Sequence, residues 1–462
     1  MTNTFVRWVL ASFFLVASLW TPAVEGRTSG QGTNVARADN EVTDAARLVT
    51  EFEVNGLKVL LKRRAGSQTV VAGLFFRGGA RNVTEKNAGV EALMLDVATE
   101  ATTNYPREKF RREISSTGTS ISYGINYDYS VLSLGTTRRF FDRSWELFVD
   151  SALRPSFALD DFQRVKNRVI VSVSDNEDVP DSFIQVLQAR AIYAGHPYLN
   201  EPRGTVQSIT SLTLEDIKKF HQEMLQTSRL LLVVVGDVDP TLLRGKVEAS
   251  FGKLPRGNYQ AVPPPQLAFS EPTLSVTARQ IPTNYIQGIF AAPALTSPDI
   301  YAMRIASSIL QNRVYVEVRV RRNLSYAPDA FLGSQEANAG GISVTAVDAN
   351  QAVKVMLDEI ARLQQVPVSS EDLKSSVQQF LTKYYLGQET NSAQAGELAL
   401  GELVGGGWRN SFQMIDRLRA VTPEDVQRVS QKYMRNLQFV VLGNPRNVDR
   451  AIFLGQNGVS GN

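Results

Sequence analysis

Apolar residues along the chain alternate between the two-residue period of strands and the 3.6-residue period of helices. Alternating segments with turns at Asn55-Gly56 and Gly78-Gly79 predict strands within residues 51–79. Beyond these glycines the apolar residues recur at i, i+3, i+4 and i+7, which predicts a helix over 86–99. The same patterns predict a hairpin at 119–134, helices at 140–153, 160–176, 181–193 and 214–225, and a strand at 230–235. The chain is therefore an α+β mixture.

Two stretches of the first half recur in the second half at nearly one offset. SLTLEDIKKF parallels AVTPEDVQRV, and its Thr213 lies 209 residues before Thr422. FALDDFQRVKNRV parallels VSSEDLKSSVQQF, and its Asp161 lies 211 residues before Asp372. Both Thr-x-Glu-Asp segments predict helix starts, with the threonine as N-cap. Two separate repeated segments at nearly the same spacing predict a duplicated domain of about two hundred residues.

The first residues predict an export signal. Arg7 precedes an apolar stretch at 8–20, which matches a signal-peptide core and is too short to span a bilayer. The alternative is an uncleaved N-terminal segment that tethers the protein to the membrane, because no clean Ala-x-Ala cleavage site is present. The protein is expected to be exported, either periplasmic or secreted. The predicted parts are a signal peptide at 1–26, a disordered lead-in at 27–44, domains at 45–254 and 273–454, a Pro-rich linker at 255–272 and a tail at 455–462.

The amino-acid composition limits the ligands and the catalytic groups that this chain can have. The 49 Lys+Arg against 46 Asp+Glu leave a formal charge of +3, which gives no field for nucleic acid. Cysteine is absent and histidine occurs twice. Disulfides, thiol nucleophiles and cysteine-based zinc sites are thus excluded, and a histidine-rich metal site nearly so.

Several separate segments together carry a family resemblance. They are NGLKVLLKRR, GLFFRGGARN, the block from ATTNYPREKF to YSVLSL, HPY at 196–198 and EVRVRRNLSYAPDA. With this order of elements, the chain resembles the insulinase/pitrilysin-type, or inverted-motif, zinc metallopeptidases. The resemblance implies two homologous domains, each a mainly antiparallel sheet with helices packed on one face. In that family two pairs of such domains close like a clam shell around a peptide, so this chain forms one half of the shell.

The residues that catalysis requires in that family are missing here. The family has H-x-x-E-H on the first helix after the glycines, with two zinc ligands and a general base. Alignment places Ala92, Leu95 and Asp96 at these three positions, and the third ligand, a glutamate, falls near Ser172. The chain is therefore expected to hold no metal and to be inactive alone.

Other polar residues offer weaker alternatives. Asp96 and Glu100 are four residues apart with Glu91 nearby, so a rearranged carboxylate metal site is conceivable, although paired acids on a helix are more often solvated. His196 lies between glycine and proline, which indicates a role in shaping a loop. His221 lies in a predicted helix and is expected to be packed or at the surface rather than a ligand.

One part of the family's substrate site is retained. The family has an arginine followed seven residues later by a tyrosine, both reaching the substrate, and these match Arg319 and Tyr326 in EVRVRRNLSY. Seven residues are two helical turns, so both side chains share a face if the helix persists. The alternative is a solvated basic face with Tyr326 as a half-buried strand residue. The arginines of that face are Arg313, Arg319, Arg321 and Arg322.

A chain without the zinc triad but with the Arg–Tyr pair resembles the non-catalytic subunit of a heterodimeric peptidase. Such a chain encloses peptide substrates and supplies Arg319 and Tyr326 in trans. A homologous H-x-x-E-H subunit is then its partner and carries the zinc, and no nucleic acid is involved. Two rivals remain: a peptide-binding or scaffold pseudo-peptidase with no role in hydrolysis, and a peptidase with a rearranged metal site.

Overall fold

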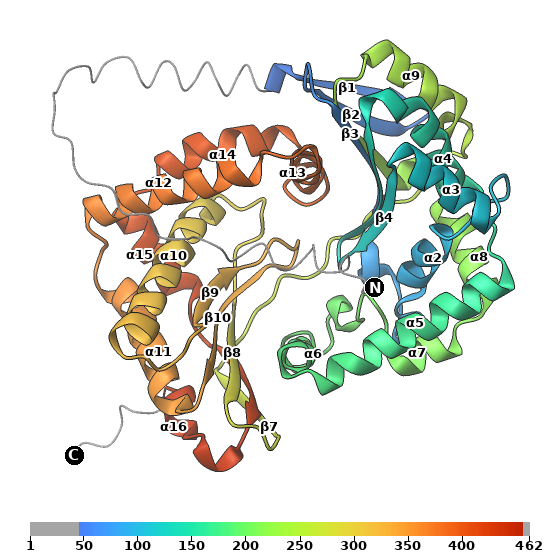
Figure 1. Ribbon diagram of the computed structural model, residues 1–462. Helices are drawn as coiled ribbons and strands as arrows, with labels where there is room; N and C mark the ends of the chain where they lie inside the picture. The colour runs from blue at the N-terminus through green and yellow to red at the C-terminus, as the bar shows by residue number, and fades with distance from the viewer. Residues whose placement is uncertain (1–45, 456–462) are drawn as a thin grey trace, which may run out of the picture. The chain divides into compact units, whose positions relative to one another are not determined.

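The computed structural model describes residues 46–455 (Figure 1). The predicted signal peptide, the lead-in and all but the first residue of the tail lie outside this range. From Leu48 on, the described residues belong to one compact unit. Within the described range, no helix has both the length and the apolar character needed to cross a membrane.

The first half is built on a six-stranded sheet. Its strand order is β1-β2-β6-β3-β5-β4, and β2 and β6 form its parallel pair. The strand β6, with the sequence LLLVVVG, is buried along its whole length, as a central strand of a sheet covered on both faces must be. The strands are β1 (Val49–Val54), β2 (Leu57–Arg63), β3 (Thr69–Arg77), β4 (Ser120–Ile125), β5 (Tyr129–Thr137) and β6 (Leu230–Gly236).

The second half repeats this topology with one strand fewer. Its order is β7-β11-β8-β10-β9, and β7 and β11 form the parallel pair. This is the order of the first sheet without β1, so the predicted duplication appears in the strand order as well. The strands are β7 (Thr273–Ala278), β8 (Asn284–Ala291), β9 (Asp329–Leu332), β10 (Ala339–Ala346) and β11 (Gln438–Gly443).

Each half packs its own helices against its sheet to form a large apolar core. The helices of the first half are α2 (Val90–Ala98), α3 (Arg107–Thr117), α4 (Phe141–Leu153), α5 (Leu159–Asp178), α6 (Pro180–Ile192), α7 (Val206–Ser211), α8 (Leu214–Met224) and α9 (Pro240–Ala249). Those of the second half are α10 (Asp299–Val314), α11 (Ala349–Gln365), α12 (Ser370–Gly387), α13 (Asn391–Leu403), α14 (Arg409–Arg419), α15 (Pro423–Tyr433) and α16 (Arg450–Phe453). The predicted α+β class with two mainly antiparallel sheets is confirmed.

The opposite face of each sheet receives a helix from the other half (Figure 1). Helix α13 contacts β3 and β6, where Leu398 and Ala399 pack against Leu231 and Val233. Helix α6 contacts β8 and β11 of the second sheet, where Ile184 lies in one apolar cluster with Val440 and Leu442. The two halves thus exchange a helix reciprocally.

The exchanged helices are also related by the repeat. Both have 13 residues, and Pro180 and Asn391 are 211 positions apart, the offset of the longer repeated segment. The predicted caps are present too, because the hydroxyls of Thr213 and Thr422 accept hydrogen bonds from Asp216 N and Asp425 N, both at 3.2 Å.

The expected single helix over 86–99 is wrong in its first turn. A 3-10 turn, η2 (Glu85–Asn87), precedes α2, and Gly89 separates the two with φ +83°. A Cβ at Gly89 would lie 2.6 Å from the carbonyl oxygen of Arg203, so a side chain there is sterically excluded. This close approach shortens α2 and places it deep in the core.

Candidate functional site

The three positions of the predicted degenerate zinc motif lie on α2. Ala92, Leu95 and Asp96 are all buried, and Leu95 packs in the apolar core of the first half. Neither Ala92 nor Leu95 has an atom that could bind a metal. Asp96 is the one potential donor of the three.

The Asp96 carboxylate is already held by an arginine. Arg168 Nη2 on α5 donates to Asp96 Oδ1 at 2.8 Å, and Arg168 Nη1 donates to Glu100 Oε1 at 3.2 Å. Burial raises the pKa of Asp96, and the charge of Arg168 opposes this. Glu100 is also paired with Arg164 at 2.8 Å. Burial opposes these contacts, but Arg164 and Arg168 together lower the pKa of Glu100. The Arg168 guanidinium therefore bridges both carboxylates of the conceivable metal site, and Arg164 adds a second cation at Glu100.

The remaining positions supply no further donors to a metal. Ser172 lies exposed on α5, one turn after Arg168. Glu91 faces away from this pair, because its carboxylate accepts a hydrogen bond from the buried Ser130 hydroxyl. Among the described residues no group of three or more potential ligands gathers. These residues do not fit a zinc ion, since the available carboxylates are consumed by arginines.

Arg168 is a residue that the sequence reasoning missed. The signal was available: Arg168 lies four residues before Ser172, so both share a face of the helix that should carry the third ligand. A cation on that face is a natural partner for an acid at position 96.

The predicted substrate pair, Arg319 and Tyr326, is brought together in the second half. Helix α10 continues into a π-helical segment, η7 (Tyr315–Arg321), which carries Arg319. The Arg319 guanidinium lies 4.0 Å from the centre of the Tyr326 ring, and its Nη1 donates to the Tyr326 carbonyl oxygen at 3.1 Å. Tyr326 is 77% exposed. The two residues form one accessible surface feature.

The reason expected for this pairing is wrong. The helix ends at Arg321, so Tyr326 does not follow Arg319 on a continuous helical face. The chain instead turns back, with Asn323 at φ +50°, and places Tyr326 over the guanidinium.

Two of the neighbouring arginines, Arg321 and Arg322, are solvent-exposed, but unlike Arg319 both are paired with an acid. Arg321 and Arg322 both donate to the carboxylate of Glu317, whose side chain is largely buried. These contacts, with the hydrogen bond from Arg322 as the largest cause, lower the pKa of Glu317. Among the described residues no carboxylate pairs with Arg319, so its charge is left for another acceptor.

Both histidines have structural roles, as expected. His196 Nδ1 accepts the backbone N–H of Tyr198 at 3.1 Å, so its Nε2 donates to Pro265 O at 2.8 Å and fixes the linker. His221 is buried, its Nε2 lies 2.8 Å from Ala152 O, and it packs edge-on against Phe157. Burial lowers the pKa of His221 and keeps it neutral.

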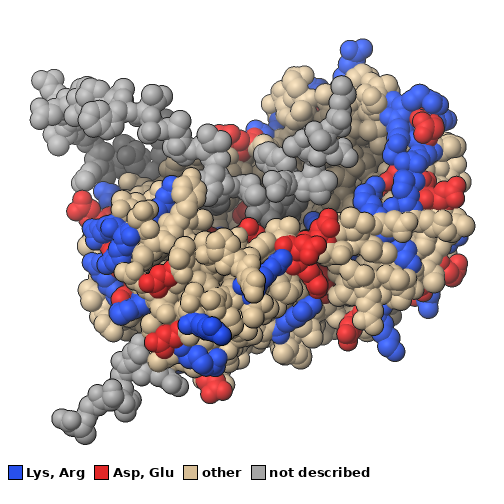
Figure 2. All heavy atoms as spheres, turned by 60° about the horizontal axis from the view of Figure 1, so that its bottom comes forward, with Lys and Arg blue, Asp and Glu red and all other residues tan. Residues whose placement is uncertain are grey.

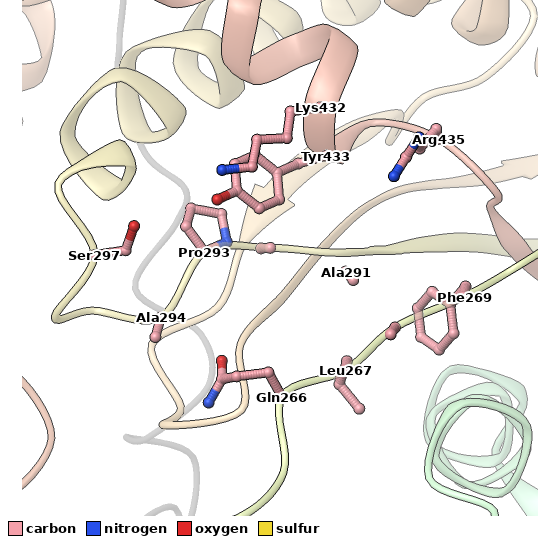
Figure 3. Close-up of a pocket in the computed structure, with 12 residues that line it drawn as sticks. Gln266, Leu267, Phe269, Ala291, Pro293, Ala294, Ser297, Lys432, Tyr433 and Arg435 are labelled. Atoms are coloured by element: carbon pink, nitrogen blue, oxygen red, sulfur yellow. The ribbon is translucent and has the colours of Figure 1, made fainter.

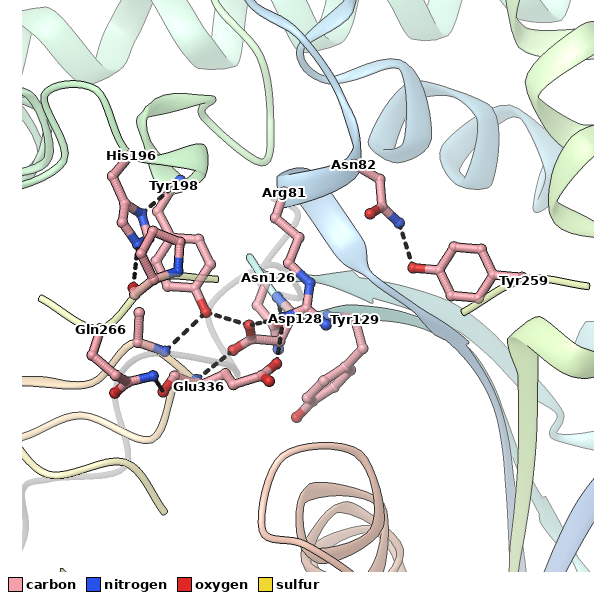
Figure 4. A network of polar contacts seen from close by, with 12 residues as sticks. Arg81, Asn82, Asn126, Asp128, Tyr129, His196, Tyr198, Tyr259, Gln266 and Glu336 are labelled. Carbon is pink, nitrogen blue, oxygen red and sulfur yellow. Dashed lines mark hydrogen bonds and ion pairs between the residues drawn. The ribbon is translucent and has the colours of Figure 1, made fainter. Parts of the chain in front are cut away.

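A buried polar network joins the two halves beside His196 (Figure 4). Asp128, at the turn before β5, accepts hydrogen bonds from the Tyr198 hydroxyl and from Glu336 N, the latter at 3.0 Å. Arg81 pairs with the carboxylate of Glu336, which lies between β9 and β10. Burial raises the pKa of Asp128, while the Tyr198 hydroxyl opposes this. The network ties a loop of the second half to the first half.

A pocket of about 410 Å³ lies between the linker and the second half (Figure 3). Its walls are largely apolar, including Leu267, Phe269 and Pro293. Two of its polar side chains, Lys432 and Tyr433, already donate to Asp299 Oδ2, each at 2.9 Å. The pocket thus presents an apolar niche without a reactive group.

Charged side chains of both signs share the face shown in Figure 2, together with a large uncharged area. No single sign covers that face. This distribution agrees with the formal charge of +3 over the whole chain.

Family models match both halves of the chain. The model described as Insulinase (Peptidase family M16) matches residues 58–205, and the model described as Peptidase M16 inactive domain matches residues 211–380. The chain belongs to the insulinase family of peptidases. Both α10 and η7 lie within the second match, and α2 lies within the first.

Members of the M16 family resemble the chain over most of its length. "Uncharacterized zinc protease YmxG" of Bacillus subtilis (strain 168) is 18% identical over 386 residues, covering 82% of this chain and 93% of YmxG. A protease from Helicobacter pylori has a TM-score of 0.77 at 18% identity, covering 86% of this chain and 99% of that one. A peptidase M16 inactive domain from Pseudomonas fluorescens has a TM-score of 0.76 at 19% identity, covering 86% and 98%. These structural likenesses establish the M16 fold.

Proposed function

We propose that this chain is the non-catalytic subunit of an exported heterodimeric zinc metallopeptidase. A homologous subunit with H-x-x-E-H holds the zinc and the general base. This chain completes the enclosure around the peptide and contributes Arg319 and Tyr326 in trans. The names of its relatives, zinc proteases on one hand and an M16 inactive domain on the other, support both sides of this division of labour.

The contrast between two sites carries the proposal. On α2, the ligand positions hold Ala92 and an Asp96 that is neutralised by Arg168. On η7, Arg319 pairs with no carboxylate of the described residues, and Tyr326, in the loop after η7, has an exposed ring. The chain has lost the donors for a metal and kept groups that can hold a peptide.

The retained pair suits a peptide under attack by water. A guanidinium offers charge-assisted hydrogen bonds to a peptide carbonyl, which fix the backbone in one orientation. A tyrosine hydroxyl can donate to the oxyanion that develops on the scissile carbonyl. Arg319 thus binds and orients the substrate, and Tyr326 stabilises charge that forms during the reaction.

The proposed location is outside the cytoplasm, periplasmic or secreted. It rests on the N-terminal stretch from Arg7 through residues 8–20, which has the layout of a signal peptide. A retained N-terminal tether is the alternative. Mass spectrometry of the mature N-terminus separates the two.

Reconstitution with the H-x-x-E-H chain tests the function. We expect no peptide hydrolysis by this chain alone and hydrolysis by the mixture. Arg319→Ala and Tyr326→Phe should each lower kcat/KM of the mixture by about 10²-fold, the range for loss of one oxyanion donor. Arg446→Ala and Tyr385→Phe, also exposed, are the matched controls and should change little.

Three outcomes would overturn the proposal. Hydrolysis by this chain alone would favour a rearranged metal site, and Asp96→Ala should then abolish both activity and metal binding. Full activity of the mixture with both Arg319→Ala and Tyr326→Phe would remove the role in trans. Peptide binding by this chain without any effect on hydrolysis by the partner would favour a scaffold or peptide-binding pseudo-peptidase.

A further inference from the structure

The Arg319 guanidinium contacts two aromatic rings. Its Cζ is 4.0 Å from the centre of the Tyr326 ring and 5.3 Å from the centre of the Tyr315 ring. Tyr326 has a match in the family pattern, but Tyr315 was not singled out in the sequence. Tyr315 begins η7, four residues before Arg319, so the two side chains are neighbours on the helix surface.

Local structure supports a specific role for this segment. A π-helix is rare and frequently lies at a functional site, and here it spans the seven residues from Tyr315 to Arg321. The arginines of this region also differ in their partners, because Arg321 and Arg322 both form ion pairs with Glu317. Arg319 is held by two rings and a carbonyl, none of which cancels its charge.

The donors of Arg319 stay largely available in this arrangement. A guanidinium carries five N–H donors in its plane, and stacking on ring faces uses none of them. The Tyr326 carbonyl accepts from Nη1. The other donors are left at the edge of the plane for a peptide carbonyl or carboxylate.

We propose that Tyr315 is a positioning residue that fixes the plane of the Arg319 guanidinium for peptide binding. This inference rests on the proposed function, in which Arg319 holds the substrate in trans. Tyr315 acts through its ring face rather than its hydroxyl, since its 40% exposed side chain makes no hydrogen bond with another described residue. Phenylalanine should therefore replace it, and leucine should not.

The first arm of the test needs only this protein. In Arg-labelled chain, the Nε–H proton of Arg319 should resonate upfield because of the ring currents of Tyr315 and Tyr326. Arg319→Lys assigns the signal. Tyr315→Leu should move it toward the value of free arginine, while Tyr315→Phe should keep it. An unmoved signal in Tyr315→Leu overturns the inference.

The second arm uses the complex with the H-x-x-E-H chain. An exposed cation–π contact corresponds to about a two- to five-fold effect, so Tyr315→Leu should lower kcat/KM by that factor. Tyr315→Phe should keep the wild-type value, and Tyr385→Leu, at another exposed tyrosine, on α12, serves as the control. Loss of activity in Arg319→Ala with full activity in Tyr315→Leu overturns the inference and keeps the proposed function. Full activity in Arg319→Ala overturns the proposed function, and the resonance alone then decides whether Tyr315 fixes Arg319.

Discussion

Helices α2 and α10 are equivalent in the two halves, because each follows the middle strand of the shared order, β3 or β8. They differ in the side chains that they expose to solvent. Helix α2 is short and buried throughout, and its Asp96 is held by Arg168. Helix α10 is longer and continues into η7, which carries Arg319 to the surface beside Tyr326. One duplicated framework thus supports an inert core helix in one half and an exposed polar site in the other.

This comparison separates what the fold needs from what chemistry needs. Both halves require a helix packed against the sheet and against the Thr-capped helix, α8 or α15, and both have these contacts. Neither half requires a metal for this packing. The fold is therefore compatible with an α2 that has no zinc donors at positions 92 and 95, provided that the buried Asp96 has a counter-charge such as Arg168.

The largest expected effect on stability comes from the exchanged helices, α6 and α13. Equivalent substitutions in the two helices should lower the free energy of unfolding by similar amounts. Leu398→Ala on α13 and Ile184→Ala on α6 each remove a side chain that is at most 3% exposed. Each should lower the free energy of unfolding by about 3 kcal/mol. Urea denaturation measures this, with Leu386→Ala, 61% exposed, as a control near zero. A loss in only one variant would show that the exchange is not equivalent in the two halves.

Removal of Arg168 should have the next largest effect. Arg168→Ala leaves Asp96 buried without its cation, and we expect a loss of about 2 kcal/mol. Burial already raises the pKa of Asp96, and the substitution raises it further because the charge and the hydrogen bond of Arg168, which lower it, are lost. The negative charge of Glu100 adds to the rise, and the hydrogen bond from the Tyr123 hydroxyl opposes it. The native state then binds more protons than the unfolded state, so the loss should grow as the pH rises from about 4 to 7.

A double variant checks the assignment. Asp96→Asn combined with Arg168→Ala should recover much of the stability lost in Arg168→Ala, because no buried charge remains. Equal stability losses in the single and double variants, at every pH, would contradict the pairing.

The second half also has an acid held by cations, Asp299, which is the first residue of α10. It accepts hydrogen bonds from Lys432, Tyr433 and Arg428. Burial opposes these contacts, but together they lower its pKa to about 2. Asp299→Asn should cost about 1–2 kcal/mol near neutral pH, allowing for the solvent around the cations.

The stability loss in this variant should also grow as the pH rises, as in Arg168→Ala, but over a lower pH range. A lowered pKa contributes stability above the unfolded value of 3.8, and this contribution is lost as the pH falls toward 2. Denaturation of the wild type and the variant between pH 5 and 2 measures it. Parallel curves over that range would contradict the assignment.

The smallest expected effect is that of chelation. If α2 holds no zinc, EDTA should leave the melting temperature of this chain unchanged, and added zinc should not raise it. Elemental analysis of the dialysed protein should find well under one zinc per chain. The H-x-x-E-H chain is the positive control. A melting temperature of this chain that falls by several degrees with EDTA would show that the residues around Asp96 do bind a metal.

Much of the fold could be predicted because local signals were strong. The caps at Thr213 and Thr422 fixed two helix starts, and the apolar strand at 230–235 was nearly exact. Helix α3 was missed, because its sequence REKFRREISST offers few apolar positions to show a period. The first turn of α2 was misjudged, because the close approach of Gly89 to Arg203 is a tertiary fact.

The site was less predictable, because its key contacts join distant segments. Arg168 meets Asp96 across 72 positions of the chain. The pairing of Arg319 with Tyr326 was expected for a reason that does not hold, since a loop and not a helix face creates it. The helix exchange was also missed, although the offset of 211 would have pointed to Pro180 and Asn391 as equivalent.

The exchange of α6 and α13 changes what a protease could do to this protein. The segment between the halves has no helix or strand from residue 255 to 272 and contains several prolines, so it is the natural place for a nick. A single cut there leaves each fragment with a helix buried against the sheet of the other, and with Glu336 still bound by Arg81. Both fragments should therefore elute together in size-exclusion chromatography and separate only in denaturant.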